Sequence, residues 1–416
     1  MHSSDPNKEF EPLRTLFLKE MAVILSSAQH ADCSSFVFAG DYSSPEIIQT
    51  PCNFFNTLFT GKVSFAKTKF AGDATFEMAT FQRDVTFRDT EFRHNSDFFE
   101  ANFMADACFV GTSFLRNAYF SNAKFYGVAD FHSAGFSRSV RFRLTDFRPL
   151  GTQRKASQPS PVFSLASFAQ PSVLFYKTDL STALFVNCDL TRIMFSAVTW
   201  RERRNGKAML FEELIGLTNE YARPLLSDRR TRNYELIAQL HHQLQNNYDR
   251  RLEYWKAGEF HYGAMEMQRL SIKKNTEWPR LRGAWHKHFS LIAWYHFASE
   301  YGENFVRPAT LLLCVLLTFG CVYPVLGLRP ALACGSALET YRSVWVSGGS
   351  RAANILHEIS MVGHGTIAAL DAATFQRNTE FTPAYPWGRF VAIVETLLTS
   401  SLFALFLLAV RRQFRR

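Results

Sequence analysis

The sequence predicts a stack of short β-strands, followed by helices and two segments that cross a membrane. Phe accounts for 41 of the 416 residues, and an excess of one residue type on this scale is typical of an internal repeat. A small residue and then a polar one precede most of these phenylalanines, which is the alternation of a half-buried strand. Two further stretches, beginning at Pro308 and Phe390, are apolar for the length that a bilayer requires.

The phenylalanines repeat with a period of eleven residues. From Phe54 to Phe147 their spacing alternates between five and six residues. An eleven-residue period also occurs in right-handed coiled coils, but a five-residue step turns a helix by about 140° and puts successive rings on nearly opposite faces. Stacked strands therefore explain the pattern better. We expect these rings to fill the core of the stack, among them Phe76, Phe81, Phe87, Phe92, Phe98, Phe103, Phe109 and Phe114.

Units such as Ala74-Thr75-Phe76-Glu77-Met78 resemble pentapeptide repeats of the Phe-centred kind, and the resemblance spans roughly residues 50–200. It implies a right-handed quadrilateral β-helix with four five-residue sides per coil, which we place at residues 31–200. One extra residue occurs in every second unit, and we interpret it as a bulge that gives coils of about 22 residues. Residues 148–162 are rich in Pro, Gly and Ser and are predicted to be an inserted loop.

A helix is predicted to cap the open N-terminal end of the β-helix within residues 1–30, because an uncovered strand edge invites association. The apolar residues of this segment recur at helical spacing: Leu13, Leu16, Phe17, Met21 and Ile24. Lys19 and Glu20 interrupt the apolar run, which disfavours a signal peptide. We therefore expect this end of the chain to be cytoplasmic.

Residues 201–306 are predicted to be a helical connector. One helix has an apolar stripe of Tyr234, Ile237, Leu240, Leu244 and Tyr248. After a break, a second helical segment contains Trp255, Phe260, Met267 and Leu270. Residues 248–270 resemble the helical hairpin that precedes the membrane spans in bacterial pentapeptide-repeat membrane proteins, and also a single degenerate tetratricopeptide hairpin. A lone hairpin favours a connecting role, and a peptide-binding groove is the alternative.

Residues 307–416 are predicted to be a membrane domain with spans at 308–328 and 390–410 and an external loop at 329–389. The first span has no charged residue and the second has only Glu395. Arg and Lys are concentrated before the first span and after the second, whereas the loop holds five Arg over about 60 residues. The positive-inside rule then places both termini in the cytoplasm. We expect a multi-pass protein of the inner (cytoplasmic) membrane, with the lipid bilayer as its partner.

The segment from Pro383 through Trp387, Gly388 and Arg389 resembles the entry to the second span of two-transmembrane potassium channels. In that register the selectivity filter falls on residues 375–380, which lack glycine and include Arg377. A carbonyl-lined filter uses backbone conformations that glycine supplies easily, and Arg377 places a positive charge where cations dehydrate. A second glycine pair, within residues 362–366, lies farther from Trp387 than a channel filter does. The resemblance thus implies a degenerate channel-like module, homo-oligomeric if it forms a pore.

Polar side chains gather on the second span: Glu395, Thr396, Thr399 and Ser400. They either pack helices together through small hydroxyl residues or, together with Arg377, line a hydrated pathway. Both interpretations stay open, and packing is favoured because Glu395 lies within two turns of the outer boundary.

The sequence offers no catalytic, cofactor-binding or metal-binding constellation. Five His and Glu residues lie close together between 241 and 266, but without H-E-x-x-H spacing. Neither a phosphate-binding G-x-x-x-x-G-K-[ST] loop nor a G-x-S-x-G elbow occurs, and the seven Cys form no C-x-x-C pair. Residues 54–147 hold eleven Lys or Arg and ten Asp or Glu, so the repeat surface is neither a basic nucleic-acid track nor an acidic mimic of one.

These observations predict a membrane-anchored, non-enzymatic, cytoplasmic scaffold for protein interaction or assembly, with an unknown cytoplasmic protein partner and no nucleic acid. The alternative is an oligomeric, two-transmembrane, ion channel-like pore with a non-standard filter, regulated by the β-helix.

Overall fold

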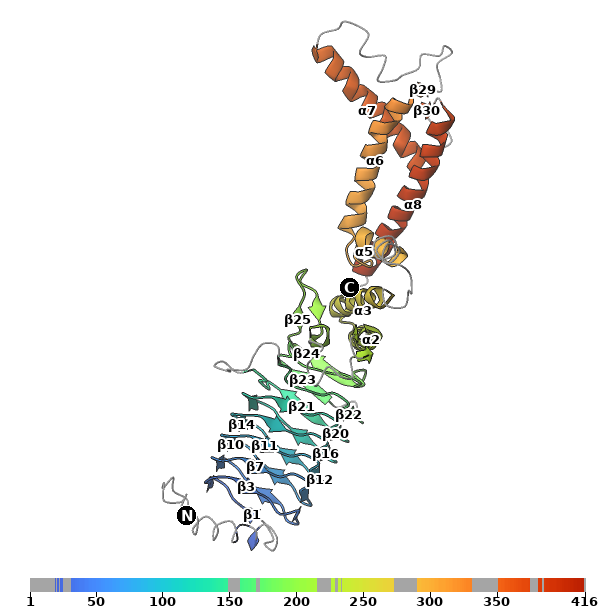
Figure 1. The fold of residues 1–416 in the computed structure, drawn as a ribbon. Coiled ribbons are helices and arrows are strands. Elements are labelled where there is room, and N and C mark those ends of the chain that lie inside the picture. Colours follow the sequence, from blue (N-terminus) through green and yellow to red (C-terminus); the bar gives the residue numbers. More distant parts are fainter. Residues whose placement is uncertain are drawn as a thin grey trace. The chain divides into compact units, whose positions relative to one another are not determined.

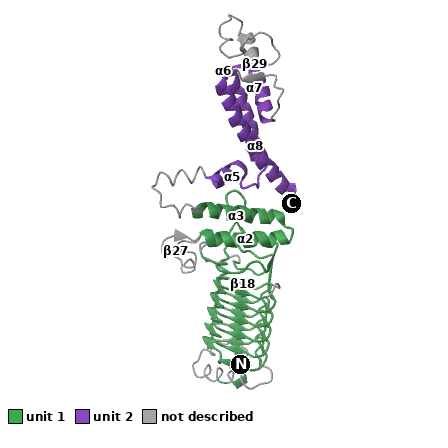
Figure 2. Ribbon diagram, turned by 90° about the vertical axis from the view of Figure 1, so that its right-hand side faces the viewer, with its two compact units in different colours: residues 1–275 green, residues 276–416 purple. Residues whose placement is uncertain are grey.

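Strands of two to four residues form a four-sided β-solenoid in the computed structural model (Figure 1). The structure describes residues 19, 21, 23–24, 31–148, 158–169, 173–214, 226–228, 231–232, 234–272, 290–330, 351–374, 381–383 and 385–414. The chain divides into two compact units, residues 1–275 and 276–416 (Figure 2). The solenoid of about seven turns belongs to the first unit, as the repeat pattern predicted.

Four parallel sheets make the sides of the solenoid, and the first five coils, β1 to β20, each contribute one strand to each side. The first sheet is β1 (Ala31–Asp32), β5 (Cys52–Asn53), β9 (Ala74–Thr75), β13 (Ser96–Asp97), β17 (Ala118–Tyr119), β21 (Val140–Arg143), β23 (Val173–Tyr176) and β24 (Ile193–Ser196). The second is β2 (Val37–Phe38), β6 (Leu58–Phe59), β10 (Thr80–Phe81), β14 (Asn102–Phe103) and β18 (Lys124–Phe125). The third is β3 (Tyr42–Ser43), β7 (Val63–Ser64), β11 (Val85–Thr86), β15 (Ala107–Cys108) and β19 (Ala129–Asp130). The fourth is β4 (Ile47–Ile48), β8 (Lys69–Phe70), β12 (Glu91–Phe92), β16 (Ser113–Phe114), β20 (Gly135–Phe136) and β22 (Ser167–Phe168).

Stacked phenylalanines form the core, because each strand points one ring inward and the next coil repeats it. Phe81 and Phe103 stack with their ring centroids 5.1 Å apart, and Phe103 and Phe125 stack at 4.5 Å. All eight phenylalanines predicted as core are at most 1% exposed. The hydroxyl groups of buried threonines beside the rings donate hydrogen bonds to backbone carbonyls; Thr90 Oγ1, for example, donates to Phe65 O at 2.6 Å. The inward and outward register of the repeat is therefore as expected.

The extra residue of every second unit lies in a corner, and its interpretation as a strand bulge was wrong. Coils pair in regular register 22 residues apart, as Ala74 with Ser96 and Ser96 with Ala118. The additional residue lies in the connections of the six-residue spacings, such as residues 60–62 between β6 and β7, and so outside the strands. The alternate corners are four-residue turns, in which, for example, Thr68 N–H donates to Phe65 O, with Lys67 at φ 62°. A positive φ at the third turn position is the geometry of a type II turn. The same corner recurs every eleven residues, at Asn56, Lys67, Met78, Asp89, Glu100, Gly111, Asn122, Ser133 and Leu144.

The predicted N-terminal capping helix lies mostly outside the described residues. The four described positions between 19 and 24 are helical, and Met21 is 2% exposed within the cluster of core side chains. Of the predicted loop at 148–162, residues 149–157 also lie outside the described part of the chain.

Two antiparallel helices close the C-terminal end of the solenoid. They are α2 (Tyr234–Arg250) and α3 (Tyr254–Ile272), and they follow a hairpin of β25 (Arg201–Glu202) and β26 (Ala208–Met209), the 3-10 turn η2 (Phe211–Glu213), and a small ladder of β27 (Leu226–Asp228) and β28 (Thr231–Arg232). Leu240, Leu244 and Phe260 join the same apolar cluster as the solenoid phenylalanines. Trp255, in the first turn of α3, is 61% exposed.

Polar side chains of α2 bond the open backbone edge of the last coil. Gln243 Oε1 accepts from Leu190 N–H at 3.0 Å, and Asn247 Nδ2 donates to Leu190 O at 2.8 Å and Ile193 O at 2.6 Å. Arg251, just beyond the helix, donates to Phe195 O. These residues recur every four positions, on one stripe of a helix. The hairpin thus supplies the partners that a further coil would have supplied.

The second unit contains the helices α5 (Leu291–Ser299), α6 (Val306–Leu326), α7 (Arg351–Ala373) and α8 (Pro386–Phe414), with the strand pair β29 (Leu328–Pro330) and β30 (Phe381–Pro383). α6 packs against both α7 and α8. α7 is a correction to the sequence analysis, which treated residues 329–389 as loop. Glu358, His364 and Asp371 lower its hydropathy below that of a span, so the search for apolar stretches passed over it.

Candidate functional site

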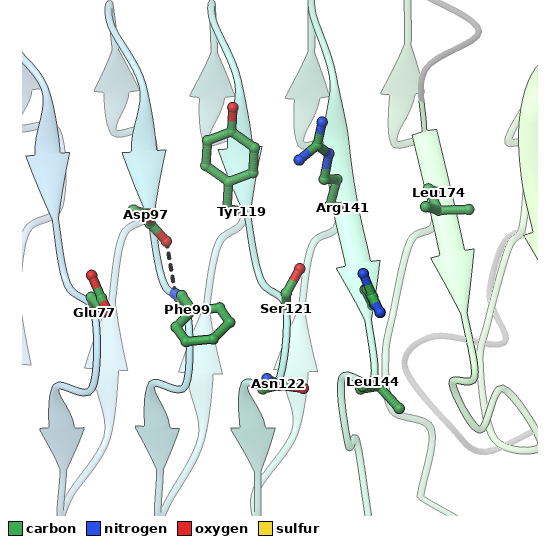
Figure 3. Close-up of a pocket in the computed structure, with 10 residues that line it drawn as sticks. Glu77, Asp97, Phe99, Tyr119, Ser121, Asn122, Arg141, Leu144 and Leu174 are labelled. Atoms are coloured by element: carbon green, nitrogen blue, oxygen red, sulfur yellow. Dashed lines mark hydrogen bonds between the residues drawn. The ribbon is translucent and has the colours of Figure 1, made fainter.

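A groove on the first sheet of the solenoid is the candidate binding site (Figure 3). It has a volume of about 740 Å³ and crosses the coils that contain β9, β13, β17, β21 and β23. Its lining is Glu77, Asp97, Phe99, Tyr119, Ser121, Asn122, Arg141, Arg143, Leu144 and Leu174.

Two ladders of outward side chains form the groove. Strand pairing places Asp97, Tyr119, Arg141 and Leu174 in one ladder, one residue per coil. The residues after the core phenylalanines form the second ladder, in the order Glu77, Phe99, Ser121 and Arg143. Ser121 is short and lies between longer side chains on either side, so the surface is hollowed there (Figure 3).

The groove is acidic at one end and basic at the other. Asp97 accepts from Phe99 N–H at 2.9 Å, and Asp97 and Glu100 both lie near Glu77. At the other end the Arg141 guanidinium lies 5.4 Å from the centre of the Tyr119 ring, and that of Arg143 lies 5.4 Å from the Tyr176 ring. Cation–π contacts of this kind leave the guanidinium N–H groups available to a carboxylate.

The acidic end is partly desolvated. Burial raises the pKa of the Asp97 carboxyl above its ordinary value. Burial and the neighbouring carboxylates of Asp97 and Glu100 raise the pKa of Glu77 in the same direction. Burial disfavours the charged form of both carboxyls, and repulsion by Asp97 and Glu100 adds to this at Glu77, so a cationic group of a ligand is favoured at this end.

The chemistry of the lining is that of recognition. It contains neither histidine nor cysteine. Carboxylates, guanidinium groups, an amide and aromatic rings instead provide charge pairing, hydrogen bonds and stacking.

A buried network links η2 to the helical hairpin. His241 Nε2 lies 2.9 Å from Glu213 Oε1, and Arg203 Nη2 lies 2.7 Å from the same carboxylate. Burial opposes ionisation of Glu213, but the hydrogen bond from His241 and the charge of Arg203 outweigh it and hold its pKa below the ordinary value. Burial lowers the pKa of His241 below its ordinary value. The network is a structural connection between α2 and the end of the solenoid.

The other His and Glu residues considered for a metal site are kept apart in similar local contacts. His242 Nε2 lies 3.1 Å from Gln268 Nε2, Glu259 pairs with Lys256, and Glu266 pairs with Arg269. Within the described residues, no group of three or more His, Cys, Asp or Glu has the arrangement to hold a metal ion.

A family model of pentapeptide repeats, in nine copies, matches residues 54–102. The solenoid is built from pentapeptide repeats. The matched residues form the coils around the acidic half of the groove, so the groove lies on a pentapeptide-repeat surface. Searches of curated proteins and of solved structures gave no match to the chain.

The polar residues predicted on the second span lie on α8, within the bundle of one chain. Glu395 is fully buried, and Tyr323 on α6 donates its hydroxyl to Glu395 Oε2. Thr396 Oγ1 lies 3.0 Å from Ala372 O on α7, and Thr399 Oγ1 donates to Glu395 O at 2.9 Å. Ser400 Oγ is buried and has no partner among the described residues. These contacts are those of helix packing, and a role in a hydrated pathway stays a prediction.

The two predicted filter positions have different outcomes. Residues 375–380, with Arg377, lie outside the described part of the chain. Residues 362–366 lie inside the helix α7, where Gly365 packs so closely on α6 that a Cβ would lie 2.0 Å from Gly320 O. This glycine pair therefore serves a helix crossing, and its backbone is not that of an extended filter.

The sequence analysis predicted neither the groove nor the polar residues of α2 that bond the last coil. Successive groove residues of each ladder are 22 positions apart in the sequence, or 33 from Arg141 to Leu174, and meet only through the register of the coils. Reading the sequence at a period of 22 residues would have aligned Asp97, Tyr119 and Arg141. The four-residue spacing of Gln243, Asn247 and Arg251 can be seen in the sequence, but polar residues at this spacing are typical of a solvent-exposed helix face. Only the structure shows that this face lies against the open strand edge of the last coil.

Proposed function

We propose that the chain is a membrane-anchored, non-enzymatic scaffold whose pentapeptide-repeat solenoid holds an interaction surface in the cytoplasm. The second unit is the anchor, and both termini lie on the cytoplasmic side. The proposal rests above all on one observation: the helices α6 and α8 are apolar enough to cross a membrane, yet only 17% of the most apolar window of each is buried.

Outward apolar side chains on both helices support a lipid environment. Leu313 and Leu317 on α6, and Ile393, Leu397 and Phe403 on α8, are each at least half exposed. A water-soluble core helix of this composition would bury these side chains, and a contiguous exposed apolar surface signals a membrane or a partner. Lipid explains why the apolar residues continue around the helices for a bilayer's thickness.

Aromatic and basic residues mark the ends of the proposed spans. α5 precedes α6 and exposes Leu291, Trp294 and Phe297 on one side. Arg412, in the last turn of α8, donates to Tyr301 O at 2.6 Å, beside the start of α6. At the other end of α8, Tyr385 and Trp387 are exposed. Aromatic residues at both ends and Arg at one are typical of membrane interfaces.

The solenoid suits an interaction surface better than a reaction site. Stacked rings fill the interior of the described coils, which leaves little room there for a substrate. Its outward ladders instead present side chains at fixed positions, one per coil.

Alkaline extraction of membranes from cells that express the full chain tests the anchor. We expect the protein to remain in the membrane pellet at high pH. Leu313→Lys combined with Leu397→Lys places charges at exposed apolar positions, each of which costs about 3 kcal/mol at the centre of a span. This variant should shift to the soluble or aggregated fraction. Leu115→Lys, at an exposed position of the solenoid, is the matched control and should stay in the pellet.

Topology reporters test the orientation. A reporter fused after Arg416 should behave as cytoplasmic, and one inserted near Ser347 should behave as external. The reverse pattern, or release of the parent chain by alkali, would overturn the proposed arrangement.

A further inference from the structure

We infer that the groove on the solenoid binds an extended segment of a partner protein that carries an acidic and a basic residue four positions apart. The inference rests on the scaffold role proposed above and specifies the partner by its chemistry. The acidic residue of the segment pairs with Arg141 and Arg143, and the basic residue pairs with Glu77 and Asp97.

The first argument is that the opposite charges of the groove are separated. No ion pair joins Arg141 or Arg143 to a carboxylate within the described residues, and Glu77 and Asp97 likewise form none there. Elsewhere on the solenoid, exposed charges do pair, as Lys62 with Asp84 and Arg93 with Glu91. The groove thus keeps two complementary charge sites apart, with Phe99 and Tyr119 between them (Figure 3).

The second argument is length. Glu77 and Arg143 are three coil steps apart in their ladder, which is about 14 Å at the spacing of neighbouring strands. Residues four apart in an extended chain are about 13 Å apart and project from the same face. A single amino acid or another small zwitterion does not bridge this distance, whereas a peptide segment does.

The third argument is that recognition here depends on side chains. The backbone groups of these coils already bond one another, as Phe98 N–H to Tyr119 O at 2.7 Å and Glu100 N–H to Ser121 O at 3.0 Å. A partner therefore gains little by adding a strand. Ser121 and Asn122 can bond the peptide backbone, while the aromatic rings pack on its intervening side chains. Arg141, Arg143 and Leu144 are exposed, so the segment can continue beyond the groove.

The test measures binding of fluorescent five-residue peptides to the full chain in lipid nanodiscs. The probe peptide is Glu-Thr-Val-Thr-Lys, blocked at both ends; a peptide with Glu and Lys adjacent has the same charges on opposite faces. Two further probes have only the acid or only the base, with Gln at the other position. We expect the first peptide to bind about tenfold more tightly than the adjacent-charge peptide, as two charge-assisted contacts require.

Two neutralised variants separate the ends of the groove. Arg141→Gln with Arg143→Gln should abolish binding of the acid-only peptide and leave the base-only peptide unchanged. Glu77→Gln with Asp97→Asn should do the converse. Glu46→Gln with Arg116→Gln changes exposed charges away from the lining and should affect neither peptide.

The inference would be overturned if all peptides bound equally well, or if both groove variants lost binding of the acid-only and base-only peptides to the same extent. Co-elution of the chain with the nanodisc reports membrane anchoring separately. If the chain enters nanodiscs but binds the peptides equally whatever the spacing of their charges, the groove assignment alone is refuted. If the chain fails to enter nanodiscs, the anchor is refuted.

Discussion

A single core phenylalanine contributes to two stacking contacts and to the filling of one coil. Phe103 is fully buried and stacks on Phe81 and Phe125. Phe103→Ala should lower the free energy of unfolding by about 3 to 5 kcal/mol, through lost burial and a residual cavity. Chemical unfolding of the full chain in detergent, followed by circular dichroism, measures this loss. Asn102→Ala, at the outward neighbour, is the control and should cost far less; equal losses would mean that the inward register is wrong.

A buried carboxyl at the end of the solenoid should make stability depend on pH. Glu212 is fully buried, and its Oε1 accepts from Phe185 N–H at 2.6 Å. Burial raises its pKa from 4.5 to about 7. The folded state therefore holds this proton more tightly than the unfolded state does. The stabilisation is complete below pH 4.5 and is lost as the pH rises to about 7.

Glu212→Gln removes this titration. Relative to the parent, the variant should gain about 3 kcal/mol of unfolding free energy between pH 4 and pH 8. Unfolding curves at the two pH values measure the change. Glu202→Gln, at an exposed position, should give parallel profiles. A constant difference between Glu212→Gln and the parent across this range would contradict the assignment.

At the scale of elements, α2 caps the last coil of the solenoid by bonding its open backbone groups. Asn247→Ala removes the donor to Leu190 O and Ile193 O, and each buried carbonyl left without a donor costs about 1 to 3 kcal/mol. We expect faster hydrogen exchange in β24 and α2, measured by mass spectrometry. Asn246→Ala, at the adjacent exposed position, should leave exchange unchanged. Unaltered exchange in Asn247→Ala would mean that the helix does not cap the coil.

The sequence predicted those elements whose pattern repeats or is strongly apolar. The phenylalanine period led to the solenoid, and hydropathy led to α6 and α8. The extra residue, as within residues 60–62, was misread as a bulge because an added residue looks the same in the sequence whether it lies in a strand or between two strands. α7 was missed because its apolar surface is discontinuous, and its Gly365 signals packing only when Gly320 lies opposite. The candidate groove depends on register between coils, which no local window of sequence contains.

For the whole molecule, ion flux separates a scaffold from a pore. Liposomes that contain the full chain should leak no faster than protein-free liposomes, since Glu395 bonds Tyr323 inside the bundle of one chain. Glu395→Gln and Arg377→Ala should leave this baseline unchanged. Protein-dependent flux that either substitution alters would instead support the oligomeric, channel-like pore and assign those residues to its lining.

The left-handed corner recurs at every eleventh residue, whereas a full coil has 22 residues. Each coil is therefore made of two similar halves on opposite sides of the axis. Duplicating 22 residues would lengthen the solenoid by about 4.8 Å and leave every face where it was. Duplicating eleven would rotate all later coils by half a turn, and Arg141 would leave the side on which Asp97 lies. A solenoid of this kind can grow by half-coils without loss of packing, but a surface that crosses several coils survives only growth by whole ones.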